Sequence, residues 1–270
     1  MRNKSSMKNI LVPVGTAANA APTLAYAIQM AQDFGSTIYV ADAEPQNVNP
    51  THIGNIKSLM HQKSDDRIKG LIATMNKGDV PVKLIQQRGT GLVETVRTLH
   101  KNIGLDIIVV APYSNKINDT VFLGPVSGSM IKRTSIPVWV APISAEYTVP
   151  KQFLLAFKRA AVDNEKTLQP LCNFVVQYTA KVRALLVKTP EGKAADWEVG
   201  PTMKALDAPL TTTTNATVYQ GVLEHFQAAA PDVLCVFKRK RGFFEKLWEP
   251  DVVLKKDFYC SVPLLILKSE

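Results

Sequence analysis

Two stretches of the chain carry groups that could hold an anion. In residues 123–127, Leu-Gly-Pro-Val-Ser begins a short helical segment, and backbone N–H groups at a helix start can bind an oxyanion because they lack an intrahelical partner. The second stretch is a run of four cations followed by Phe243, Phe244 and Trp248, a combination that could contact phosphates and stack on bases. A solvated loop with its aromatic residues packed inside the fold explains this run more simply, and we prefer that interpretation. The cations are Lys238, Arg239, Lys240 and Arg241.

Motifs of metal and hydrolytic chemistry are missing from the sequence. It contains no HExxH, no paired Cys/His spacing and no GxSxG turn, and its four histidines are scattered. The Arg-Gly-Thr-Gly run at residues 88–91 is too short for a P-loop and lacks the Lys-Ser/Thr ending. It indicates a tight turn from a strand into a helix, at a sheet edge where a nucleotide could lie beside it. We therefore expect no metal ion, and we assign no reaction to the chain.

Charge and cysteine content narrow the cellular setting. The formal net charge of +9 suits acidic partners such as nucleotides or nucleic acid, although solubility alone would also account for it. Three cysteines without CxxC spacing are typical of free thiols in a reducing compartment, and Cys235 and Cys260 lie in or beside apolar runs, as core residues do. The short polar N-terminus predicts neither a secretion signal nor a membrane span. We expect a cytoplasmic protein that does not contact a membrane.

Alternating apolar runs and amphipathic segments predict an α/β fold. Apolar runs bounded by turn residues indicate buried strands, and the spacing of Leu24, Ala27, Ile28 and Ala31 indicates one face of a helix. Strands that alternate with helices form a parallel sheet with right-handed crossovers. In the first part of the chain we expect strands at about residues 9–14, 37–41, 82–86, 107–110 and 138–140, and helices at about 20–34, 53–75, 92–99 and 125–133.

The chain contains this arrangement twice. Asp232 begins a second apolar run at a fixed distance from Asp106 (232 − 106 = 126), and Pro263 follows Pro137 at the same distance (263 − 137 = 126). Equal spacing over two separate strands indicates an internal repeat. The early strands match at a larger offset (182 − 38 = 144), so the second repeat has lost much of the long polar helix, and residues 190–207 form a shorter substitute. We expect repeats at residues 7–143 and 151–270, joined by a polar linker.

The first repeat resembles the universal stress protein family. The resemblance rests on Asn-Ile-Leu-Val-Pro-Val at residues 9–14, the alanine-rich helix that follows, and the segment from Gly124 to Val138. The second repeat is similar but has weaker motifs, so the whole chain resembles a tandem member of this family. The resemblance implies two Rossmann-like units, each a five-stranded parallel sheet of order 3-2-1-4-5 with helices on both faces. It also implies that the last strands of the two units pair with each other in a dimer-like join.

Members of this family that bind ATP carry three glycines after strand four and an Asp at the end of strand one. Here the first two glycine positions hold Ala111 and Ser114, and the Asp position holds Gly15. Gly124 keeps the third position, but the next residue, Pro125, has no N–H to offer. In the second repeat the matching positions hold Phe237, Lys240, Pro250 and Lys158. A ligand in the first repeat would lie against Val14, Gly15, Val40, Gly89, Ala111, Ser114, Gly124, Val126 and Ser127.

Three hypotheses for function remain open at this point. The preferred one is a non-catalytic stress-response protein of tandem type with a degenerate nucleotide site, which needs no cofactor and acts through protein contacts or a small ligand. The first alternative is an adenine-nucleotide-binding protein that holds ATP in the first repeat. The second is an anion or nucleic-acid binder that uses residues 238–241. We expect either a homo-oligomer or an intrachain pseudo-dimer.

Overall fold

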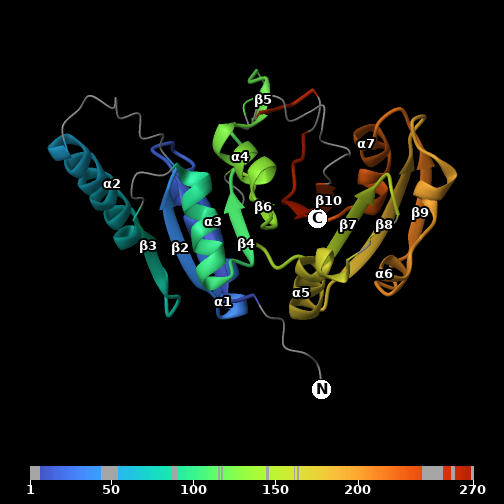
Figure 1. Ribbon diagram of the computed structural model, residues 1–270. Helices are drawn as coiled ribbons and strands as arrows, with labels where there is room; N and C mark the ends of the chain where they lie inside the picture. The colour runs from blue at the N-terminus through green and yellow to red at the C-terminus, as the bar shows by residue number, and fades with distance from the viewer. Residues whose placement is uncertain are drawn as a thin grey trace.

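The computed structural model describes residues 7–43, 54–86, 91–114, 116, 118–143, 146–160, 162, 164–238, 252–256 and 259–268. We call residues 7–143 the first half and residues 151–270 the second half; Figure 1 shows them in blue to green and in yellow to red. In the first half the elements are β1 (Asn9–Val14), α1 (Ala20–Phe34), β2 (Thr37–Asp42), α2 (Gly54–Thr74), β3 (Val82–Ile85), α3 (Leu92–Ile103), β4 (Ile107–Val110), β5 (Val121–Leu123), α4 (Pro125–Arg133) and β6 (Val138–Val140).

The second half repeats much of this order with shorter elements. They are β7 (Gln152–Phe157), the 3-10 turn η1 (Glu165–Thr167), α5 (Gln169–Tyr178), β8 (Lys181–Lys188), the 3-10 turn η2 (Ala194–Trp197), α6 (Pro201–Lys204), β9 (Leu210–Thr214), α7 (Val218–Ala229), β10 (Val233–Lys238), β11 (Val253–Leu254) and β12 (Leu264–Lys268). The turn η2 and helix α6 stand where the first half has the long helix α2, as the change in repeat spacing predicts.

Ten strands form one large sheet flanked by helices. Their order is β3-β2-β1-β4-β6-β12-β10-β7-β8-β9, so each half has the predicted order 3-2-1-4-5 and the two halves meet at β6 and β12 (Figure 1). Every neighbouring pair in this sheet is parallel except β6 and β12, which run antiparallel with Trp139 opposite Leu265. The α/β fold class, the strand order and the join between the last strands are therefore confirmed.

Side chains of the strands alternate between two apolar layers, one on each face of the sheet. Helices α1, α2 and α5 cover one layer, which includes Val12, Val40 and Leu265. Helices α3, α4 and α7 cover the other, which includes Leu11 and Ile266. Because both faces are covered, the strands can be apolar throughout, and this is why they appear in the sequence as continuous apolar runs.

Helix α1 shows how local sequence sets an element's length. Its buried face contains Leu24, Ala27, Ile28 and Ala31, the residues expected from their spacing. The helix ends at Gly35, which adopts a left-handed conformation with φ of 64° and donates its N–H to carbonyls of the last turn. Within the described part of the chain, every helix is too short or too polar to span a lipid bilayer.

One small feature was not predicted. Strands β5 and β11 form a separate two-stranded antiparallel sheet, so a segment close to the C-terminus pairs with one just before α4. Residues 252–256, where β11 lies, form a strand and a turn, and the described residues 259–263 are also non-helical, so no counterpart of α4 appears in these parts of the second half. Two- and three-residue strands leave no periodic signal in a sequence.

Aromatic side chains fill the space between the halves. Trp139 of β6 is 1% exposed, and its ring centroid lies 4.8 Å from that of Phe174 on α5. Phe34, at the end of α1, packs edge-on against Phe174 with centroids 5.3 Å apart. The hydroxyl of Tyr147, in the linker, lies 2.5 Å from both Asp33 and Tyr178. These contacts tie α1, the linker and α5 into one apolar cluster.

Truncation of Trp139 tests how far this cluster stabilises the chain. Trp139→Ala should lower the free energy of unfolding by about 3–5 kcal/mol, because it removes a fully buried ring and leaves a cavity. Urea unfolding followed by circular dichroism measures the loss. Val176→Ala on α5, where the side chain is 51% exposed, is the control and should change stability by less than about 0.5 kcal/mol. Equal effects of the two substitutions would contradict the packing described.

Candidate functional site

A cavity of about 280 Å³ lies at the carboxyl ends of β1 and β4. These two parallel strands are neighbours in the sheet, and the chain winds outward from them in opposite directions. In doubly wound α/β sheets such a reversal point leaves a crevice between two strand-to-helix loops, where ligands bind. The walls come from the loop that leads from β1 into α1, the loop after β4, and the first turn of α4. The lining residues within the described part of the chain are all uncharged.

The first turn of α4 offers the cavity two backbone donors. Gly124 is the N-cap, and Pro125 at the first helical position has no N–H. The N–H of Gly128 is the first to bond within the helix, to the carbonyl of Gly124 at 2.8 Å. The N–H groups of Val126 and Ser127 precede it and have no carbonyl within the helix to bond. The hydroxyl of Ser127 donates to the carbonyl of Ala111 at 2.7 Å, so it fastens α4 to the end of β4.

Tyr113 borders the same cavity from the loop after β4. Its backbone N–H donates to the carbonyl of Phe122 at 2.7 Å, and its side chain is 60% exposed. A Cβ atom built on Gly124 would lie 2.7 Å from Cδ2 of the Tyr113 ring. Glycine at position 124 therefore permits the ring to lie against the start of α4, where a larger residue would displace it.

A buried carboxylate lies one strand away from the position where the family places its Asp. Asp42, at the end of β2, is 5% exposed, and its Oδ1 accepts from Nη2 of Arg67 at 2.8 Å. The hydroxyl of Ser64 donates to its other oxygen. Arg67 also donates from Nη1 to the carbonyl of Gly15 at 2.8 Å. The charge of Asp42 is therefore paired with Arg67, and Arg67 ties α2 to the ends of both β1 and β2.

Five of the predicted site residues come together in the cavity wall: Gly15, Ala111, Gly124, Val126 and Ser127. Val14 and Val40 belong instead to the apolar layer under α1, because they are the inward-facing residues of their strands. Ser114 lies beyond the lining residues, where its hydroxyl accepts from the N–H of Lys116 at 3.0 Å. Gly89 lies outside the described residues.

Sequence reasoning missed several residues of the wall. Asn19 donates from Nδ2 to the carbonyl of Pro112 at 3.2 Å and so connects the two loops. Thr23 lies one turn further along α1 and donates its hydroxyl to the carbonyl of Asn19 at 2.6 Å. Thr16 and Tyr113 complete the polar part of the lining. The only available signal was their position just after an apolar strand, which many residues share.

The corresponding region of the second half is built differently. Phe237 replaces the first glycine of the pattern and is buried, with its ring centroid 6.4 Å from that of Phe157. Of the predicted anion-binding cluster, Lys238 ends β10 and donates to the carbonyl of Lys132 on α4. Arg239, Lys240 and Arg241 lie outside the described residues, as does Pro250. In the described part of the chain, no group of three His, Cys, Asp or Glu side chains could hold a metal ion.

The fold and the cavity define a doubly wound α/β protein with a ligand-sized crevice at the reversal point of its sheet. The universal stress protein family model matches residues 7–142, half of the chain, and the chain belongs to the universal stress protein family.

Solved structures with the same fold match both halves. A universal stress protein from Archaeoglobus fulgidus has a TM-score of 0.69 and 13% sequence identity, over 98% of this chain and 97% of its own. A functionally unknown protein from Pseudomonas aeruginosa has a TM-score of 0.61 and 14% identity, over 100% of this chain and 95% of its own. At these identities the similarity concerns the fold. Comparison with curated proteins found no match.

Removal of the Arg67 guanidinium tests how far its pairing with Asp42 stabilises the fold beside the cavity. Arg67→Met should lower the free energy of unfolding by about 2–3 kcal/mol, because it leaves the Asp42 carboxylate buried without its cation. Lys69→Met on the same helix is the control: Lys69 and Asp66 are each 62% exposed and 3.8 Å apart, and the loss should stay below about 0.5 kcal/mol. Thermal unfolding measures both variants. Adding Asp42→Asn to Arg67→Met should recover part of the lost free energy of unfolding. If the loss in the double variant equals the sum of the losses in the two single variants, the pairing of Asp42 with Arg67 is contradicted.

Proposed function

We propose that this chain is a non-catalytic, tandem member of the universal stress protein family whose first half binds a small, uncharged ligand. The lining of the cavity carries the proposal. Among the residues that the structure describes, it contains no cation to neutralise a phosphate chain, and the glycine-rich contacts with phosphate that the family resemblance implies are reduced to Gly124. A volume of about 280 Å³ is near the lower end of ligand sites, which are typically about 300–1,000 Å³.

The tandem organisation has two lines of support. The second half repeats the strand order of the first, with β9-β8-β7-β10-β12 in the places of β3-β2-β1-β4-β6. The similarity to the Archaeoglobus fulgidus structure extends over 98% of the chain, well beyond the residues that the family model matches. On this basis we propose units at residues 7–143 and 151–270. Because β6 and β12 already pair with each other, the join that this family is expected to use between subunits is made within one chain.

We propose that the chain is not catalytic because two hydroxyl groups of the cavity wall are already bonded and two of its thiols are buried. The hydroxyls of Ser127 and Thr23 donate to backbone carbonyls, and the described lining of the cavity has no His, Asp, Glu or Lys to act as a general base. Cys235 and Cys260 are both buried, and burial raises the pKa of the Cys260 thiol to about 12. A thiol with so high a pKa is a poor nucleophile at neutral pH. We expect the protein to act in the cytoplasm through contacts with other proteins.

An adenine nucleotide is the second candidate ligand. The N–H groups of Val126 and Ser127 at the start of α4 favour a partial negative charge in the cavity. Against a triphosphate, Pro125 removes one donor from this helix end, and the carbonyl of Gly15 is bonded to Arg67 where the family places its Asp. These observations favour the nucleoside part of a nucleotide over its phosphates.

Titration of the full-length protein with adenosine and with ATP, by calorimetry, separates these candidates. We expect adenosine to bind at least as tightly as ATP, because the described lining has no cation to compensate for the charge of the phosphates and only two backbone donors. Gly124→Val should weaken adenosine binding at least tenfold, since the new side chain would drive Tyr113 out of its place against α4. Gly70→Ala, at an exposed position of α2 with open space around it, is the control. Saturable binding of ATP that is tenfold tighter than that of adenosine would overturn the proposal.

A further inference from the structure

The part of the cavity wall formed by Tyr113 and the first turn of α4 belongs to a segment that the second half of the chain contacts at both ends. This segment, residues 113–133, contains Tyr113, β5 and helix α4, and we call it the cavity segment. We propose that the second half acts as the positioning partner of the cavity: β11 holds the front of the cavity segment, and Lys238 and Lys268 hold its rear. This inference rests on the proposed function in one respect, namely that this cavity is the ligand site.

The front contact lies one residue before the start of α4. Val253 of β11 is opposite Leu123 in the antiparallel pair, and Leu123 directly precedes Gly124. The backbone N–H of Lys255 donates to the carbonyl of Thr120 at 2.7 Å, and the Lys255 ammonium reaches the carbonyl of Lys116.

Side chains reinforce this backbone pairing. The ring of Tyr259 packs against Phe122 of β5, with centroids 5.4 Å apart, and Val253 is fully buried. Phe122 in turn accepts the hydrogen bond from the Tyr113 backbone. Two consecutive links therefore run from β11 through β5 to the tyrosine that borders the cavity, and the ring of Tyr259 packs on β5 beside them.

The rear contact is made by lysine side chains at the last carbonyls of α4, which have no partner within the helix. Lys268 at the end of β12 donates to the carbonyls of Ile131 and Met130, the second at 3.4 Å. Lys238 at the end of β10 donates to the carbonyl of Lys132. The charge of Lys238 is favourable at this position because the helix dipole is negative at a C-terminus.

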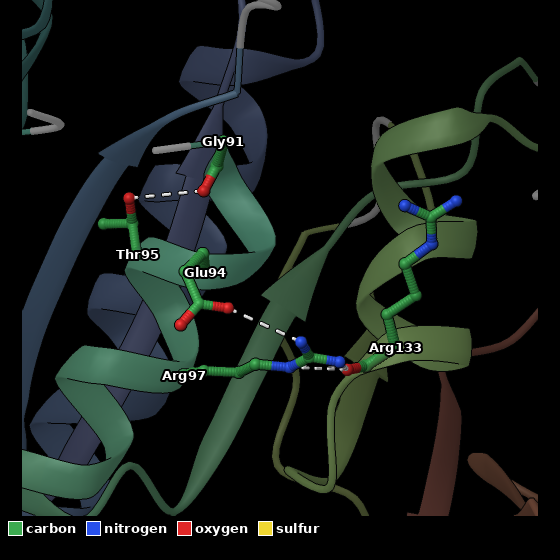
Figure 2. Close-up of polar contacts among 5 residues, drawn as sticks. All are labelled: Gly91, Glu94, Thr95, Arg97 and Arg133. Carbon is green, nitrogen blue, oxygen red and sulfur yellow. Dashed lines mark hydrogen bonds and ion pairs between the residues drawn. The ribbon is translucent and has the colours of Figure 1, made fainter. Parts of the chain in front are cut away.

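The first half contributes one further contact to the same helix end. Figure 2 shows Arg97 of α3 directed at the carbonyl of Arg133. This carbonyl accepts from Nη2 of Arg97 at 2.8 Å and from Nε at 3.2 Å. Glu94 forms an ion pair with the guanidinium of Arg97. Carbonyls 130–133 therefore all accept from basic side chains, two of which come from the second half.

The length of α4 explains why such support matters. A helix of nine residues is too short to be stable by itself, so its position depends on what holds its two ends. The N-terminal end of α4 presents Gly124, Val126 and Ser127 to the cavity. Moving either end would therefore move the donors of the site, although neither β11 nor the two lysines touch the cavity.

Hydrogen exchange of the full chain, read by mass spectrometry, tests the front contact without any ligand. Lys255→Pro removes the N–H that bonds Thr120, whereas Lys255→Ala keeps this N–H and removes only the ammonium. Exchange in residues 121–133 should be at least tenfold faster in the proline variant than in the alanine variant, with β1 and β10 as protected as in the unmodified chain. Unchanged exchange in this segment, or an equal rise throughout the chain, would overturn the positioning role.

The rear contact is tested by Lys238→Met together with Lys268→Met, and Lys181→Met at an exposed position of β8 is the control. Exchange at the C-terminal turn of α4 should rise in the double variant and stay unchanged in the control; equal exchange in the two would contradict the contact. Adenosine affinity should fall in Lys255→Pro and in the double lysine variant and be retained in both controls. Failure of the unmodified protein to bind adenosine would count against the proposed function, while the exchange results would still decide the positioning role.

The pH dependence of stability gives an independent measure of Lys268. Burial and the charge of Lys238 lower the pKa of Lys268 from 10.5 to about 6. Between these values the unfolded chain binds more protons than the folded one, so stability should rise with pH across this window. Lys268→Met should show a smaller rise between pH 6 and pH 9 in chemical unfolding, and parallel profiles would contradict its burial against α4. Among the described residues, the other charged groups on α3, α4 and β10 are Lys238, Lys132, Arg133, Arg97, Lys101 and Glu94, of which Glu94 is paired with Arg97.

Discussion

Strands β6 and β12 are each the last strand of a parallel half-sheet, and each would be an apolar edge if the other were removed. Val138, Trp139, Leu265 and Ile266 are at most 1% exposed, so neither strand could face water without losing much of the burial that stabilises it. Antiparallel pairing satisfies their backbone groups and covers both apolar edges in one step. The continuous ten-stranded sheet, the aromatic cluster around Trp139 and the contacts on α4 all require this pairing.

Pairing in opposite directions also decides which ends of the two halves meet. The carboxyl ends of β10 and β12 lie level with the amino end of β6, and therefore beside the C-terminus of α4, which leads into β6. Lysines at these strand ends consequently reach the carbonyls of a helix from the other half. In a chain with a net charge of +9, this arrangement brings two lysine side chains to the backbone carbonyls at the negative end of a helix dipole.

Polar groups beside the cavity join elements of the fold. Asp42 at the end of β2 is paired with Arg67 of α2. The hydroxyl of Ser127 fastens α4 to the end of β4. These groups are therefore less available to a charged ligand, and the described lining leaves open a mostly apolar crevice with two backbone donors. This is the basis of the proposal that the cavity binds an uncharged ligand.

The sequence by itself determined the α/β class, the bounds of α1, the internal repeat and the place of Gly124, because apolar periodicity, turn residues and repeat spacing are local signals. Through family resemblance it also indicated the strand order and the join between the last strands. Only the tertiary structure decided the partners of Asp42, the pairing of β11 with β5, and the contacts of Lys238 and Lys268 with α4. These contacts join residues 22 to 138 positions apart, and each depends on how two elements are placed in space, which no local pattern of residues encodes.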